Sequence, residues 1–80
     1  MGMIGNVVYI IVCHYFRENH RQIETVHATW DGAFKRLQRI KEINEDAGYE
    51  VTESENGYID CRLNGRLVYE YLVVTKTIEK

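Results

Sequence analysis

The sequence predicts an α+β fold, in which a mostly antiparallel sheet of four or five strands carries one amphipathic helix on one face. Only residues 30–47 show the spacing of three and four between apolar side chains that is typical of an amphipathic helix. Two Asn-Gly pairs, at 56–57 and 64–65, are typical of tight turns between antiparallel strands. Residues 7–16 contain no charge, glycine or proline and are mostly β-branched or aromatic, which favours a strand. The expected order is β-β-α-β-β-β in one domain, residues 1–80.

The strand expected at residues 7–16 has two apolar faces, because its odd and its even positions are both largely hydrophobic. Strands of that kind lie inside a sheet and need cover on both sides. We expect this strand to be internal and to lie beside residues 66–75, the other strongly apolar strand. A weaker strand is expected at residues 23–29, antiparallel to the first because the connection between them is short.

The helix expected at residues 30–47 has recognisable ends. Thr29 is suited to cap its first turn, and Gly48 is suited to end it in the left-handed conformation. Its apolar face contains Trp30, Ala33, Phe34, Leu37, Ile40, Ile43 and Ala47. Asn44 lies within the same face. We expect this face to pack against the sheet.

The two Asn-Gly turns set the predicted register of the C-terminal strands. At the turn at 56–57, a three-residue loop is favoured, because it pairs Val51 with Cys61 and avoids two like charges opposite each other. At 64–65, a two-residue hairpin is expected, followed by a regular ladder. That ladder pairs Arg62 with Leu67, Cys61 with Val68, Asp60 with Tyr69, Ile59 with Glu70 and Tyr58 with Tyr71.

This register gives the C-terminal strands two different faces. The face expected under the helix contains Tyr49, Val51, Ile59, Cys61, Leu63, Val68 and Leu72. The opposite face, here called the predicted tyrosine surface, contains Tyr58, Leu67, Tyr69, Tyr71 and Val73 together with Glu50, Asp60 and Arg62. One helix covers only one face, and large exposed apolar patches rich in tyrosine mark association sites. The sequence therefore predicts a non-enzymatic protein-binding or inhibitor protein, with this surface as the seam of a sheet-to-sheet homodimer or the site of a protein partner.

A binding module for single-stranded nucleic acid, such as RNA, is the alternative function. Bases would stack on Tyr58, Tyr69 and Tyr71, with Arg62 and Arg66 supplying positive charge. The acidic side chains nearby cancel much of that charge, and a formal net charge of −2 does not require a nucleic-acid partner. On the helix, Lys35, Arg36 and Arg39 are candidate contacts for a polyanion, although a solvated helix face has the same pattern.

The sequence argues against an enzyme, a metal site or a cofactor. The three histidines lack metal-ligand spacing, and the side chains of His14 and Cys13 point to opposite faces of one strand. No glycine-rich phosphate loop or nucleophile motif is present. Cys13 and Cys61 lie in apolar strand patterns, which suits free thiols in a reducing cytoplasm. No apolar run is long enough to span a membrane, so a cytoplasmic location is expected.

Residues 8–14 form a Val-Tyr-rich strand, and a charged loop, a short strand and a helix with Ala33, Leu37 and Ile40 follow it. This pattern, over about the first 47 residues, resembles small uncharacterised proteins common in phage and bacterial genomes. The resemblance implies a small accessory protein that acts by binding, such as an inhibitor of a host factor or an antitoxin. The double Asn-Gly meander departs from that group, and the resemblance assigns no functional residue.

Overall fold

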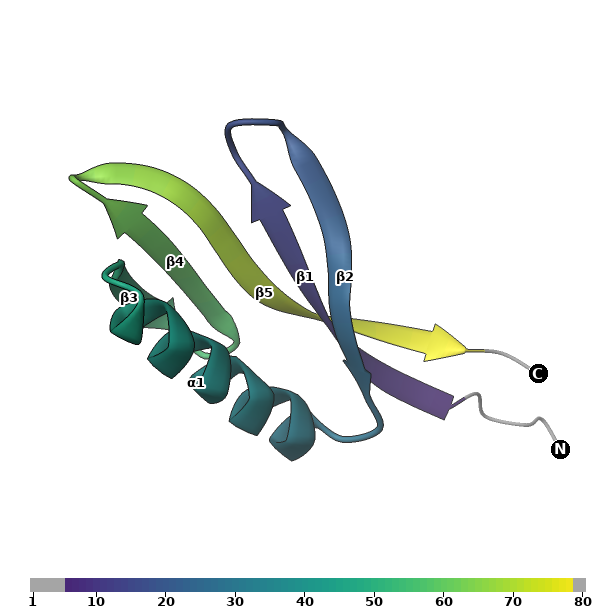
Figure 1. The fold of residues 1–80 in the computed structure, drawn as a ribbon. Helices are drawn as coiled ribbons and strands as arrows, with labels where there is room; N and C mark the ends of the chain where they lie inside the picture. The colour runs from purple at the N-terminus through teal and green to yellow at the C-terminus, as the bar shows by residue number, and fades with distance from the viewer. Residues whose placement is uncertain (1–5, 79–80) are drawn as a thin grey trace, which may run out of the picture.

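The computed structural model describes residues 6–78, which form one five-stranded antiparallel sheet and one helix (Figure 1). The elements are β1 (Asn6–Tyr15), β2 (His20–His27), α1 (Trp30–Asp46), β3 (Glu50–Glu55), β4 (Tyr58–Leu63) and β5 (Arg66–Ile78). The spatial order of the strands is β2-β1-β5-β4-β3. The predicted α+β class and the order β-β-α-β-β-β are therefore confirmed.

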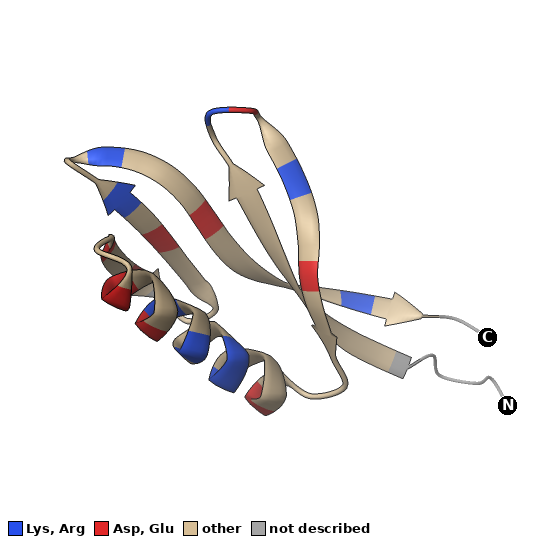
Figure 2. Ribbon diagram, in the orientation of Figure 1, with Lys and Arg blue, Asp and Glu red and all other residues tan. Residues whose placement is uncertain are grey.

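β1 is an inner strand, as its two apolar faces predicted. It pairs antiparallel with β2 on one side and with β5 on the other, which confirms the expected neighbour. It contains no Lys, Arg, Asp or Glu, whereas every other element carries at least one of these residues (Figure 2). On the helix side of β1, Ile11 and Cys13 are fully buried.

β2 begins earlier than predicted and also ends earlier. The connection after β1 closes within residues 16–19, where Asn19 adopts a positive φ of 51° and its N–H donates to the carbonyl of Phe16. Pairing therefore starts at once, with His20 opposite Tyr15. Thr29 does not belong to β2, because it caps α1.

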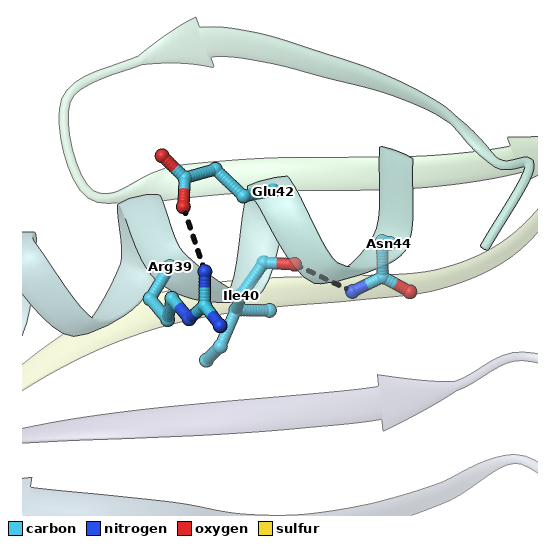
Figure 3. A network of polar contacts seen from close by, with 4 residues as sticks. All are labelled: Arg39, Ile40, Glu42 and Asn44. Carbon is cyan, nitrogen blue, oxygen red and sulfur yellow. Dashed lines mark hydrogen bonds and ion pairs between the residues drawn. The ribbon is translucent and has the colours of Figure 1, made fainter. Parts of the chain in front are cut away.

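α1 begins and ends close to the predicted residues. The Thr29 hydroxyl accepts a hydrogen bond of 3.0 Å from the backbone N–H of Gly32, and Gly48 follows the helix with a φ of +99°. The buried residues of the helix are Ala33, Leu37, Ile40 and Asn44. Asn44 is accommodated because its amide donates to the carbonyl of Ile40 at 2.9 Å (Figure 3).

The hydrophobic core lies between α1 and one face of the sheet. Its buried members are Ile11, Cys13, Leu37, Ile40, Ile59, Cys61 and Tyr71. Both cysteines are free and buried. They cannot form a disulfide within the chain because β5 lies between their strands.

The turn at 64–65 is the predicted two-residue hairpin, in which Asn64 and Gly65 have positive φ values of 53° and 78°. Between β3 and β4 the predicted pairing of Val51 with Cys61 is also observed. The loop itself differs from the expectation. It is closed by Glu55 opposite Tyr58, and the irregularity lies within β3.

The two glycines of the Asn-Gly turns provide a matched test of close packing. Gly57 and Gly65 have φ values of +81° and +78°, but only a Cβ at Gly57 would meet a neighbour, Trp30 Cη2, at 2.7 Å. Gly65→Ala should cost ~1–2 kcal/mol for the left-handed backbone. Gly57→Ala should cost at least ~1 kcal/mol more, because Trp30 must leave its packing on Tyr9 and Phe34. Urea unfolding of both variants measures the difference, and equal losses would contradict the role given to this contact.

The outer strands β2 and β3 form the two edges of the sheet. β2 contains a bulge at Glu24, because Ile23 and Thr25 pair with successive residues of β1. β3 is acidic and includes Glu50 and Glu53.

Candidate functional site

A one-residue bulge in β5 decides which side chains face away from the helix. The ladder starts as predicted at the hairpin, with Arg62 opposite Leu67, but Cys61 then pairs with Tyr69. Val68 is left without an opposite residue. Because side chains alternate along a strand, such a bulge moves every following residue to the other face. The predicted register is therefore wrong beyond Arg62.

The predicted tyrosine surface is not formed. Tyr71 lies opposite Ile59 and is only 8% exposed in the core under α1. Tyr69 and Val73 also pack against this core, whereas Tyr58 pairs with Leu72 on the opposite face. The tyrosines proposed to stack nucleic-acid bases thus do not share a face, which removes the geometric basis of the alternative function.

Glu70 is the residue of the sequence that could have indicated the bulge in β5. A regular ladder would set Glu70 opposite Ile59, beneath the helix, where a carboxylate without a partner is costly. With the bulge, the core receives Tyr71 at this position, and Glu70 lies opposite Asp60 on the other face. Core burial therefore outweighs the repulsion between the two carboxylates, which lie near His14 and Arg62 respectively.

The face of the sheet opposite α1, here called the open face, is covered by no other element of residues 6–78 (Figure 1). Two apolar rows cross it. One row contains Ile23, Val12, Leu72 and Tyr58, and the other contains Val26, Ile10 and Val74. Ile23, Val26 and Val74 are 60%, 56% and 39% exposed. A hollow of about 200 Å³ on this face is lined by Val12, His14, Arg21, Glu70, Leu72 and Val74.

A polar row, here called the charged row, runs across the open face beside the apolar rows. In strand order it contains Arg21, His14, Glu70, Asp60 and Thr52, each opposite the next. His14 Nδ1 lies 3.7 Å from Glu70 Oε2, and Arg62 Nε lies 3.6 Å from Asp60 Oδ1. Asp60 is only 9% exposed, and its Oδ1 accepts no hydrogen bond from the described residues.

The remaining predicted residue, Leu67, lies away from the apolar rows. It lines a cleft of about 620 Å³ at the end of the sheet, beside Phe16, Arg17 and Tyr49. Sequence reasoning placed Tyr58, Asp60 and Arg62 on the face opposite the helix but missed Val12, Leu72 and the other members of the charged row. The even face of the first strand was recognised as apolar, but nothing in that strand says which of its faces the helix covers.

The titratable groups of the core are held in their neutral forms. Burial raises the pKa of Cys61 to about 12, and it also raises the pKa of Cys13. The pKa of Tyr71 is raised by burial as well. On the open face, burial and the Glu70 carboxylate raise the pKa of Tyr58 to about 12. None of these thiols and phenols is activated as a nucleophile near neutral pH.

The candidate polyanion contacts lie on the outer side of α1, where a block of basic residues is flanked by acidic residues towards both ends of the helix (Figure 2). Lys35 pairs with Asp31 at 3.2 Å, and Arg39 pairs with Glu42 at 3.1 Å (Figure 3). These pairs partly neutralise the basic segment, and Arg36 is also exposed. The arrangement is that of a solvated helix surface.

The described residues contain no group of three or more His, Cys, Asp or Glu side chains arranged to hold a metal ion. Within residues 6–78, α1 is also neither long nor apolar enough to cross a membrane.

Comparison of the chain with protein-family models finds no match. Neither a curated protein nor a solved structure matches it. The function is therefore inferred from the chain's own residues.

Proposed function

We propose that this is a small non-enzymatic protein-binding protein, of accessory or inhibitor type, which acts through its open face. In this proposal a second copy of the chain covers that face, and the two sheets stack as a homodimer. The observation that carries the proposal is the pair of apolar rows, which no element of the described chain covers. The buried free thiols suit a cytoplasmic, reducing environment.

The size of the open face supports a stable interface. Soluble proteins rarely leave contiguous apolar patches of more than a few hundred Å² exposed, and burial of such surface contributes about 25 cal/mol per Å². The molecule measures 54 × 25 × 17 Å, so the thin direction holds one sheet and one helix. The two long directions leave room for the ~800 Å² per partner that standard interfaces bury.

The chemistry of the chain supports binding rather than catalysis. Cys13 and Cys61 are buried in the core, away from any surface that a substrate reaches. On the open face, His14 and Glu70 line a hollow of about 200 Å³ beside the apolar rows, and Asp60 lies opposite Glu70. A hollow of this volume is smaller than the ~300–1,000 Å³ of typical small-molecule sites.

Val74→Lys tests the proposal at an exposed position in the middle of the open face. A lysine there places a charge within the apolar interface, so the dimer should dissociate at least ~10-fold more readily, a loss of ~1.4 kcal/mol. Sedimentation velocity over micromolar concentrations measures this dissociation.

Ile43→Lys is the matched control, because Ile43 is apolar and 47% exposed but lies on α1, away from the open face. It should leave the dimer unchanged. A wild-type protein that sediments as a monomer throughout this range would overturn the homodimer, as would equal behaviour of the two variants.

A further inference from the structure

We infer that two copies stack their open faces about a two-fold axis that runs parallel to the strands, between β1 and β5. In this arrangement Arg21 of each copy contacts Asp60 of the other. The inference rests on the proposed homodimer and adds its symmetry and the residues that select it.

The charges of the charged row are ordered across the sheet. Its basic end is Arg21 on β2, and its acidic end is Glu70 on β5 and Asp60 on β4, where Arg62 Nε lies 3.6 Å from Asp60 Oδ1. His14 on β1 stands between the two ends and already lies 3.7 Å from Glu70. A surface with one basic and one acidic end is self-complementary when a second copy meets it in the reverse direction.

The strand order determines which axis gives that reversal. With β1 and β5 at the centre of the open face, an axis between them places β2 of one copy over β4 of the other. Arg21 then lies over Asp60, and His14 lies over Glu70, twice in each dimer. Stacked sheets keep their strands within about 30° and lie ~10 Å apart, a gap that an arginine side chain spans.

The same axis matches the apolar rows with each other. Val12 and Leu72 are opposite each other in one row, and Ile10 and Val74 are opposite each other in the next. Reversal about the axis places Val12 of one copy over Leu72 of the other, and Ile10 over Val74. No apolar side chain of these pairs is set against a charge.

Asp60 provides the second observation that points to an incoming cation. Its Oδ1 is buried and accepts no hydrogen bond from residues 6–78, and the Arg62 Nε at 3.6 Å is too distant to donate one. A buried acceptor without a donor is costly. The guanidinium of an arginine offers several donors in a planar arrangement that fits a carboxylate, so Arg21 of a second copy can pair with the part of the Asp60 side chain that remains exposed.

An axis perpendicular to the strands is the competing symmetry. It would place β5 of one copy over β5 of the other, running in the opposite direction. Glu70 of one copy would then lie over Lys76 of the other. β2 and β4 do not extend to the row of Lys76. That symmetry would therefore leave Arg21 and Asp60 without partners.

The test is an exchange of charges between the two ends of the charged row. Arg21→Glu and Asp60→Lys should each weaken their own homodimer at least ~10-fold, because like charges then meet at both contacts. Mixed together, the two variants should form a heterodimer of nearly wild-type affinity, since each contact again joins opposite charges. Sedimentation of each variant and of the mixture measures this recovery.

Further variants keep the test decisive if Asp60→Lys does not fold. Arg21→Lys retains the charge and should dimerise nearly as the wild type, whereas Arg21→Glu should not. Arg36→Glu makes the same charge change on α1 and should have no effect. If the wild type dimerises and Val74→Lys dissociates it, but Arg21→Glu does not, the axis is wrong while the proposed function stands. Dissociation by Lys76→Glu alone would assign the perpendicular axis instead.

Discussion

Between pH 9 and pH 12 the protein should lose a large part of its stability, because its buried thiols ionise more readily in the unfolded chain than in the folded one. Burial raises the pKa of Cys61 from 9.0 to about 12. Below pH 9 the thiol is protonated in both states, and its contribution to stability is fully present. Above pH 9 the unfolded chain releases the proton and the folded chain keeps it, so the free energy of unfolding falls by ~1.4 kcal/mol per pH unit.

The loss from Cys61 alone is on the order of 4 kcal/mol by pH 12, and small domains have only ~5–15 kcal/mol in total. The pKa values of Cys13 and Tyr71 are also raised by burial, so these groups act in the same direction. Urea unfolding at successive pH values between 7 and 11 measures the effect.

Cys61→Ala provides the control for this pH dependence. The variant loses some packing at every pH. Between pH 9 and pH 10, however, its free energy of unfolding should fall less steeply than that of the wild type, because one ionising thiol is missing. A free energy of unfolding that stays constant up to pH 11 in the wild type would contradict the burial of both cysteines.

Leu37→Ala should remove ~2–5 kcal/mol of stability, which is the usual cost of truncating a fully buried leucine. Leu37 is completely buried in the core formed by α1 and the inner strands. A chain of 80 residues has little stability to spare, so this single change should bring the protein close to unfolding at room temperature.

Ile43→Ala, on the same helix, is the matched control. Ile43 is about half exposed and outside the core, so its truncation should cost less than ~1 kcal/mol. Urea midpoints of the two variants give the comparison. Equal losses would mean that the helix does not pack on the sheet through the face described here.

Local signals were sufficient to predict the elements and most of their pairing. The helix was recognisable from Thr29, Gly48 and the apolar spacing between them, and Asn64-Gly65 specified its own turn geometry. The internal position of β1 followed from its two apolar faces. Each of these signals lies within a few residues of the chain, where propensity and turn chemistry act directly.

The content of the open face was not predictable in the same way. Because Val68 is unpaired, every later residue of β5 lies on the opposite face of the sheet from the one predicted. No local sequence preference marks Val68 as the place of a bulge. The bulge is selected by the whole core, which accepts Tyr71 and excludes Glu70. The prediction that one face of the sheet would lack cover needed only the number of helices. The residues on that face were predicted wrongly because the observed β4–β5 register differs from the predicted one by one residue.

The edges of the sheet limit how large an assembly of this protein becomes. An exposed strand edge is a template on which further strands add, and continued addition leads to fibrils. Here one edge is broken by the bulge at Glu24, and the other carries Glu50 and Glu53. Where β5 extends past β4, Lys76 provides a charge on the strand. Growth within the plane of the sheet is thereby opposed. In the proposed homodimer, stacking also covers the apolar rows of both open faces, so neither direction would favour the addition of a third chain.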